Sequence, residues 1–486
     1  MTVPLRRRPD YRLLWASRTI SVAGTEVSKL AVPLTGITLL AASPSQMGLL
    51  TAAAFAPALL FGLQAGAVSD RLRRHRPLMI GCELVSAAAA LAVPAAWLLG
   101  VLSVPLLVVV AFVIGTAGVV FRAAGFPHLA TVVPAGLRTE AMAGLQASYS
   151  VASVAGPGLG GLLVQVLTAP LAVLVEGVSF LLSALLMGRI RTPESHTPAA
   201  SRGMLRDVGE GLRACLSNPS LRALLGAGVT INFFAMAYTA VYMLYLVNVL
   251  AIPKGLIGVL VALSGVGGLL GAWLTARLNR RTGTNRLLKW SVVLFPIDFL
   301  TIGLIGGPMW WKVLAMAVSG VATGMLVVTF ATCMGAVQLR EAPAELRGRV
   351  NSTFTFAVQG VLAVGGLVGG VLAEVVGLRA VILVCAAGIA LSALWIWASP
   401  LRGSELGSAR PRSGAVPSRT SMWARPSSAV NPPGYISPGR GSSGYSSSGY
   451  SSFGYGRRGH VPAGRVDQTM GPAIYELTLV KMRSLM

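Results

Sequence analysis

The chain has 486 residues, of which 54% are hydrophobic and only 12% are charged, and its formal net charge is +24. Soluble domains contain about 25% charged residues, so this composition excludes a soluble protein and indicates one that crosses a membrane many times. The positive charge does not require nucleic acid as a partner, because basic loops that face anionic lipid headgroups account for much of it.

Apolar runs of about 20 residues, each long enough to cross a bilayer as a helix, recur along most of the chain. The predicted spans are 15–41, 46–69, 77–100, 103–133, 141–167, 170–188, 222–249, 256–278, 287–306, 310–338, 350–375 and 378–398. We therefore expect an all-α membrane protein whose twelve helices form two pseudo-symmetric bundles of six. The expected parts are an N-terminus (1–14), a first bundle (15–188), a linker (189–221), a second bundle (222–399) and a tail (400–486).

Arginines gather in the loops at one end of the predicted bundles. They include Arg6, Arg7, Arg8, Arg12, Arg71, Arg73, Arg74, Arg76, Arg138, Arg189, Arg191, Arg277, Arg280, Arg281, Arg340, Arg347 and Arg349. The opposite loops contain only Lys254, Lys312 and Arg379. This asymmetry predicts that both termini lie in the cytoplasm of a protein of the cell membrane.

Segments in the two halves repeat each other. Residues 156–161 (Gly-Pro-Gly-Leu-Gly-Gly) return as residues 365–370 (Gly-Gly-Leu-Val-Gly-Gly), and residues 134–138 return as 343–347. Both pairs are separated by roughly 209 residues, so a long stretch aligns with itself without a gap. A membrane protein built from two similar halves is typical of a secondary transporter, whose substrate site lies between the repeats.

The linker and the tail differ from the spans in composition. Residues 204–215 alternate charged and apolar residues at helical spacing, which fits an amphipathic helix on the inner membrane surface or, equally, a solvated connector. Residues 403–466 are rich in Ser, Gly, Pro and Arg. Such a stretch buries too little apolar surface to fold, so we expect the cytoplasmic tail to be disordered.

The four cysteines are Cys82, Cys215, Cys333 and Cys385. They form no CxxC pair, and three fall inside predicted helices, so we expect buried thiols and neither a disulfide framework nor a metal site. No Walker-type phosphate-binding loop is present, so an ATP-driven mechanism is not expected and an ion gradient would supply the energy. We expect no catalytic activity, no cofactor and a monomer.

The loop between the second and third spans is similar to a family signature. Residues 66–76 resemble the Gly-x-x-x-Asp-Arg/Lys-x-Gly-Arg/Lys-Arg/Lys motif of the major facilitator superfamily. Gly66, Asp70, Arg71 and Arg74 fill their places. Arg73 replaces the expected glycine, and His75 replaces a basic residue.

This resemblance implies a role for Asp70. It would bind the positive N-terminal end of the eleventh span, near Arg349, and hold the inner gate closed. The alternative is that Asp70 only balances Arg71 and Arg74. Thr275 occupies the matching position in the second half, so the lock would be charged in one half only.

The fifth span contains Gly156, Pro157, Gly160 and Gly161. This Gly-Pro-x-x-Gly-Gly segment resembles the signature of the drug:proton antiporter branches of the superfamily. The glycines provide a small-residue face for close helix packing, and the proline is expected to bend the helix by freeing a backbone carbonyl. Segments 13–15, 31–34 and 347–350 resemble bacterial macrolide-efflux and enterobactin exporters, and the whole resemblance covers residues 10–400.

Ionisable residues at membrane depth are costly and are functional candidates by default. Glu26 lies near the middle of the first span, and Lys29 follows three positions later on the same helix face. Glu26 either exchanges a proton and pairs with Lys29 in one state only, or forms a permanent ion pair. Asp298 is a second-rank proton site, and Arg122 would bind an anionic group or stabilise a nearby acid.

Aromatic residues on the seventh span are candidates for the substrate cavity. Tyr238, Tyr242 and Tyr245 share one helix face by their spacing, with Asn232 nearby. They would stack on an organic substrate, or they face lipid and the membrane interface.

The leading hypothesis is a proton-coupled antiporter that exports a small amphipathic organic compound (an antibiotic, another drug or a siderophore) by alternating access. The alternatives are a proton-coupled nutrient importer and a non-transporting scaffold or sensor that acts through the basic tail. The expected partners are membrane lipid, protons and a small-molecule substrate.

Overall fold

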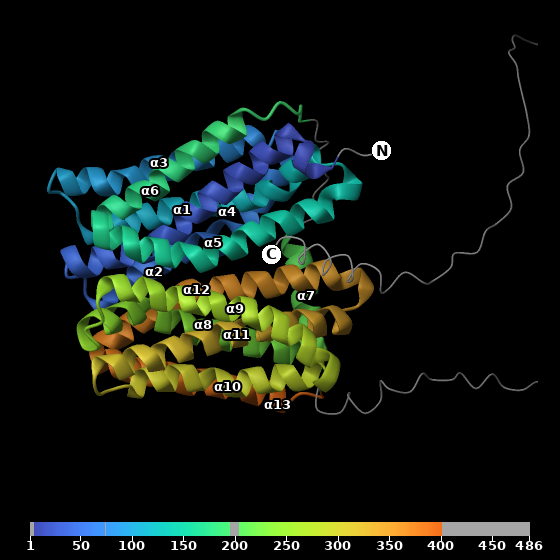
Figure 1. Cartoon of the computed structure of the whole chain (residues 1–486). Helices are drawn as coiled ribbons and strands as arrows, with labels where there is room; N and C mark the ends of the chain where they lie inside the picture. Colours follow the sequence, from blue (N-terminus) through green and yellow to red (C-terminus); the bar gives the residue numbers. More distant parts are fainter. Residues whose placement is uncertain (1–3, 73, 195–203, 401–486) are drawn as a thin grey trace, which may run out of the picture. The chain divides into compact units, whose positions relative to one another are not determined.

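The computed structural model describes residues 4–72, 74–194 and 204–400, and these residues form helices and no strands (Figure 1). The first bundle contains α1 (Pro9–Leu39), α2 (Pro44–Arg71), α3 (Arg76–Leu98), α4 (Val104–Val132), α5 (Arg138–Leu167) and α6 (Ala169–Gly188). The second contains α8 (Pro219–Leu244), α9 (Lys254–Thr282), α10 (Thr284–Leu304), α11 (Met309–Glu341), α12 (Arg347–Val376) and α13 (Leu378–Trp397).

Shorter elements connect them. A helix α7 (Met204–Ser217) lies in the linker, where the alternating pattern predicted an amphipathic helix. The 3-10 turns η1 (Leu5–Arg7), η2 (Ala135–Leu137) and η4 (Ala344–Leu346) precede α1, α5 and α12, and a π-helical turn η3 (Tyr245–Val249) follows α8. The expected disordered tail lies outside the described residues.

Eleven of the twelve long helices in the described ranges are long and apolar enough to span a membrane. The exception is α1, which contains Arg18, Glu26 and Lys29. It nevertheless packs along α5 and α6 as an integral part of the first bundle. The most polar of the long helices is therefore surrounded by its neighbours, which is the usual place for ionisable groups in a membrane protein.

The starts of α1 and α8 differ from the predicted spans because their first turns contain polar residues that a hydropathy reading leaves out. α1 begins at Pro9 instead of residue 15, with Asp10 in its first turn, so its polar start escapes a hydropathy reading. α8 begins at Pro219 instead of residue 222. The Oδ1 atom of Asn218 caps it by accepting the backbone N–H groups of Ser220 at 2.9 Å and Leu221 at 3.3 Å.

Glycines bring the two bundles together. A β-carbon added to Gly48 of α2 would lie 2.7 Å from the Cα of Gly370 of α12. One added to Gly161 of α5 would lie 2.8 Å from the Cα of Gly258 of α9. Gly161 and Gly370 lie near the ends of α5 and α12, and Gly48 and Gly258 lie near the starts of α2 and α9. Both contacts are therefore at the side of the molecule opposite to the start of α1. Side chains larger than hydrogen would hold these backbones apart.

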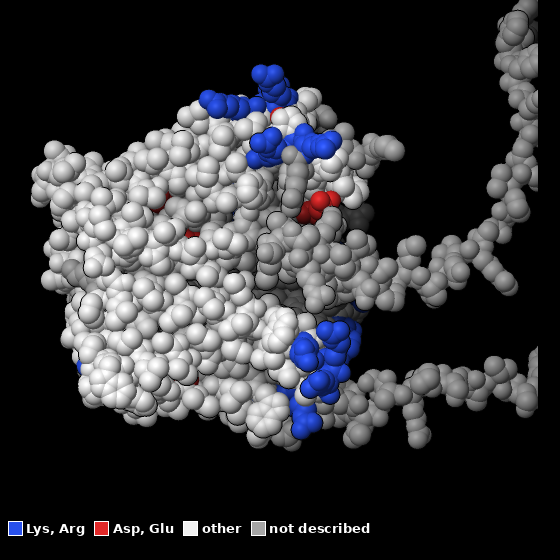
Figure 2. Space-filling model, in the orientation of Figure 1, with Lys and Arg blue, Asp and Glu red and all other residues white. Residues whose placement is uncertain are grey.

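Figure 2 shows Lys and Arg side chains gathered at one end of the visible face, while the surface along the helices is almost free of charge. This is the end at which α1 begins and α9 ends with Arg280 and Arg281. The distribution matches the asymmetry that predicted a cytoplasmic location for this end.

Candidate functional site

Glu26 of α1 is buried and paired. Its side chain is 5% exposed, and its Oε1 atom lies 2.6 Å from the Nζ atom of Lys29, as the i, i+3 spacing predicted. The Lys29 side chain is 57% exposed. The pair thus joins a carboxylate inside the bundle to an ammonium group at the bundle surface.

A second acid, Glu176 of α6, lies beside this pair. It is buried, and Thr25, Ser28 and Lys29 are its polar neighbours. α6 reaches α1 here because Gly24 has no side chain, and a β-carbon at that position would lie 2.7 Å from the Cβ of Ser179. Two buried carboxyl groups therefore share one ammonium group, which lies at the bundle surface.

The fifth-span motif contacts both α1 and α9. A β-carbon at Gly156 would overlap the Cβ of Glu26, and one at Gly160 would lie 3.0 Å from the carbonyl oxygen of Val27. On the adjoining face, Gly161 packs against Gly258 of the second bundle. α5 runs unbroken through Pro157. The motif is thus a packing surface that connects the Glu26 region of α1 to the other bundle.

A cavity of about 370 Å³ lies between α1, α4 and α5. Its wall contains Arg18 of α1 and Arg122 of α4, with Tyr149 of α5 beside Arg122. The guanidinium carbon of Arg18 lies 4.4 Å from the centre of the Phe121 ring, a cation–π contact. The rest of the wall is mostly apolar.

Glu83 of α3 is a further buried acid close to this cavity. It accepts a hydrogen bond from the hydroxyl of Ser21 at 3.3 Å and lies near enough to Arg18 for an electrostatic interaction. Glu83 and Glu176 are both buried, and each has serine or threonine hydroxyl groups among its neighbours. Arg18, Glu83 and Glu176 are the residues that the sequence-based selection missed, although the polar face of α1 could have pointed to them.

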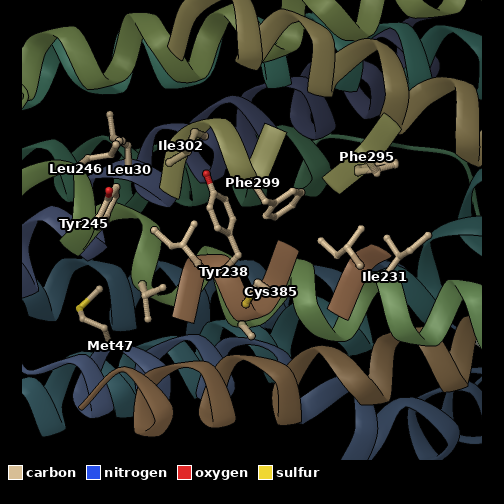
Figure 3. Packing of buried hydrophobic residues seen from close by; sticks show 14 of the residues in the cluster. Leu30, Met47, Ile231, Tyr238, Tyr245, Leu246, Phe295, Phe299, Ile302 and Cys385 are labelled. Carbon is tan, nitrogen blue, oxygen red and sulfur yellow. The ribbon is translucent and has the colours of Figure 1, made fainter. Parts of the chain in front are cut away.

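Asp298 of α10 is buried in the second bundle, where it accepts a hydrogen bond from the hydroxyl of Ser319. Tyr238 and Tyr242 of α8 lie nearby, and their rings stack with centroids 4.8 Å apart. Figure 3 shows Tyr238 against Phe299, and their ring centroids are 4.5 Å apart. Asp298 therefore has polar and aromatic neighbours and is not isolated.

The remaining aromatic candidates have separate surroundings. Tyr245 is fully buried, and the Nε atom of Arg379 donates to its hydroxyl at 3.4 Å. Asn232 donates to the carbonyl of Gly228 at 2.8 Å. Neither Asn232 nor the three tyrosines of the seventh span line the cavity between α1, α4 and α5. Their contact with substrate therefore stays a prediction.

The loop between α2 and α3 is fixed by His75. This residue is fully buried, and its Nε2 atom lies 3.0 Å from the carbonyl oxygen of Ser69. The Ser69 hydroxyl in turn donates to the carbonyl of Ala123 at 3.2 Å. The side chains of Asp70 and Arg71 lie outside the described part, so the expected lock at the start of α12 stays a prediction.

The segment after α6 is fastened to the first bundle at the same end. The carboxylate of Asp10 accepts the backbone N–H of Thr192 at 2.8 Å and also its hydroxyl. Glu194 accepts the backbone N–H of Arg76 at 3.0 Å and contacts Nδ1 of His128 at 2.5 Å. Desolvation raises the pKa of Asp10, but the hydrogen bonds from Thr192 and Arg191 outweigh it and hold that pKa below its ordinary value of 3.8.

Solved structures with a similar fold are transporters. One is a bacterial homologue of the human lysosomal transporter Spinster, in an inward-facing and unoccupied conformation, with a TM-score of 0.61, 15% identity, and 82% of this chain and 97% of that chain covered. A bacterial homologue of the iron transporter ferroportin in the inward-facing state has a TM-score of 0.66 at 15% identity, with 82% and 99% covered. At this identity the likeness shows the fold.

Relatives with similar sequences include the multidrug efflux pump Tap of Mycolicibacterium fortuitum, which is 29% identical over 67% of this chain and 80% of its own. The pump of the same name from Mycobacterium tuberculosis is 26% identical over 80% of this chain and 92% of its own. A family model described as "transmembrane secretion effector" matches residues 2–420. The chain therefore belongs to the transmembrane secretion effectors of the major facilitator superfamily.

Proposed function

We propose that this membrane transporter exports a small amphipathic organic compound in exchange for protons, with Glu26 as the group that takes up and releases the proton. The observation that carries the proposal is the contact of Glu26 with Gly156. It joins a buried carboxylate to the helix that packs against the second bundle. The relatives described as multidrug efflux pumps favour export over nutrient import.

The charges around Glu26 can respond to a proton. Lys29 neutralises one carboxylate, yet Glu26 and Glu176 both lie within its reach. Carboxyl groups that share one site rarely ionise together, so such a cluster has a place for one proton. Protonation of Glu26 would break its pair with Lys29 and free that ammonium group to interact with Glu176.

Helix packing connects the protonation of Glu26 to the contact between the two bundles. Glu26 lies against Gly156 without an intervening side chain, and Gly161 on the same helix touches Gly258 of α9. A shift of α1 at Glu26 therefore acts on the contact between the bundles. Alternating access needs such a coupling between a chemical event and the relative position of two rigid units.

The described conformation corresponds to one of the two states of alternating access. The bundles touch through Gly48 with Gly370 and Gly161 with Gly258 at the end opposite to the start of α1. The cavity lies in those halves of α1, α4 and α5 that adjoin the other, basic end. With the basic end in the cytoplasm, this is the state that receives substrate from inside the cell.

Transport by purified protein in liposomes tests the proposal, with ethidium and fluorescein as a cationic and an anionic dye. We expect Glu26→Gln to reduce export driven by a pH gradient at least about 10-fold, because the amide cannot carry a proton. Passive exchange of dye without a gradient should continue. Glu345→Gln, an exposed acid outside the bundles' interior, is the control. Gradient-driven export by Glu26→Gln at the wild-type rate would show that Glu26 is not the coupling group.

A further inference from the structure

The cavity between α1, α4 and α5 has an unbalanced positive charge. Arg18 has Glu83 as an electrostatic partner, whereas no carboxylate forms an ion pair with Arg122 in the residues that the structure describes. Arg122 is nonetheless 10 residues from the end of α4 at Val132, roughly 15 Å along the helix. An uncompensated cation at such a depth is costly, and a bound anion would offset this cost.

The guanidinium groups also have unused hydrogen-bonding capacity. The Nε atom of Arg18 is buried and has no hydrogen-bond partner among the described residues. Arg122 is exposed and lines the cavity, and Tyr149, near enough for an electrostatic interaction, lines it too. A guanidinium group holds a planar oxyanion through two parallel hydrogen bonds, which an ammonium group cannot match in geometry.

The remaining wall selects for an apolar body. Leu14, Val22, Phe126, Leu129, Met142 and Leu145 are part of the lining. With a volume of about 370 Å³ the cavity lies at the lower end of the range for small-molecule sites. Its shape and chemistry suit one charged group at the two arginines and a hydrocarbon or aromatic portion against these side chains.

We infer that this cavity is the substrate site and that it selects organic monoanions, in which a carboxylate or similar oxyanion binds Arg122 and Arg18 while an apolar body packs against α1, α4 and α5. The inference rests on the proposed export function and adds the substrate class to it. Of the two roles that its position in the fourth span suggested, it gives Arg122 the binding of an anionic group rather than the stabilisation of a nearby acid.

A matched set of ligands tests the charge preference directly. Equilibrium dialysis of the purified full chain in neutral detergent would compare naphthaleneacetate, naphthaleneacetamide and naphthylmethylamine, which differ mainly in charge. We expect the wild-type protein to bind the anion at least about 10-fold more tightly than the amide, and the cation least. Equal affinity for the three, or preference for the cation, would overturn the inference.

Variants assign the preference to the arginine. Arg122→Gln should weaken binding of naphthaleneacetate at least about 30-fold and leave the amide within about threefold of wild type. Arg122→Lys keeps the charge but loses the two parallel hydrogen bonds, so it should bind naphthaleneacetate more weakly than wild type and still prefer it to the amide, which also covers the case in which Arg122→Gln does not fold. Arg280→Gln removes an exposed arginine outside the cavity and is the control. An equal loss for all three ligands in Arg122→Gln would mean that Arg122 only supports the fold.

Three further outcomes distinguish this inference from lipid binding and from the proposed export function. Displacement of naphthaleneacetate by phosphatidylglycerol but not by excess benzoate would assign the site to a lipid headgroup and contradict a substrate site. Because binding needs no gradient, an anion preference without any export by liposomes would overturn the proposed function alone. Proton-driven export of ethidium with no anion preference would overturn the substrate class alone.

Discussion

The contact between α5 and α9 offers two glycines whose substitution should have opposite consequences. A β-carbon at Gly161 would lie 2.8 Å from the Cα and 3.2 Å from the backbone nitrogen of Gly258. A β-carbon at Gly158 would lie 3.6 Å from the Cβ of Ala262, an ordinary van der Waals contact. Both residues lie on α5, and both face α9. Gly158→Ala is therefore a matched control for Gly161→Ala.

The distances set the size of the effect. In Gly161→Ala the neighbouring atoms belong to backbone and cannot rotate away, so the two helices must separate by about half an ångström. Overpacking of this kind costs about 1–3 kcal/mol, while alanine gains about 1 kcal/mol over glycine in a helix. Since α5 is helical whether the contact is open or closed, this gain cancels in the opening equilibrium, and the contact between α5 and α9 should lose about 1–3 kcal/mol, which corresponds to about a 5- to 150-fold change in that equilibrium. Gly158→Ala keeps the helical gain without the clash.

Hydrogen–deuterium exchange of the peptides that contain the end of α5 and the start of α9 measures this difference. We expect faster exchange in Gly161→Ala, because local opening becomes easier, and unchanged or slower exchange in Gly158→Ala. Thermal unfolding of both variants shows whether the whole fold is affected. Equal exchange in the two variants, or faster exchange in Gly158→Ala only, would contradict the packing argument.

Two other substitutions test the same kind of reasoning. Gly156→Ala should impair proton-driven export more than Gly158→Ala does, because its β-carbon overlaps Glu26; similar export by the two variants would count against the contact. Asp10→Asn should lower the free energy of unfolding by about 1 kcal/mol at neutral pH, since a charged hydrogen-bond acceptor is lost. Because the folded pKa of Asp10 is lowered from 3.8, this stabilisation is present above that value and lost as the pH falls through the folded pKa. A difference between the proteins that persists in strong acid would contradict this role.

Much of the architecture was predictable because a segment that crosses a bilayer must be apolar and long enough to span it. Apolar runs of about 20 residues predicted the twelve long helices, since a helix satisfies its own backbone groups in lipid. The repeat between residues 156–161 and 365–370 predicted two halves. The i, i+3 spacing also predicted the pair of Glu26 and Lys29, because residues of one helix have fixed relative positions.

Contacts between helices were not predictable in this way. Glu176 and Glu83 come from α6 and α3, and nothing in their own spans indicates that they approach α1 at Lys29 and Arg18. The helix starts at Pro9 and Pro219 were missed because their first turns contain polar residues that a hydropathy reading leaves out, and at Pro219 the side-chain cap from Asn218 marks the start.

The sequence by itself determined the class of protein, the number of long helices and the pair on α1, because these depend on composition and on spacing within one helix. Only the tertiary structure decided that Gly156 lies against Glu26, that Gly161 meets Gly258, and that Arg18 and Arg122 share one cavity. Those facts depend on how each helix is rotated and which helix lies next to it, and side-chain packing sets both.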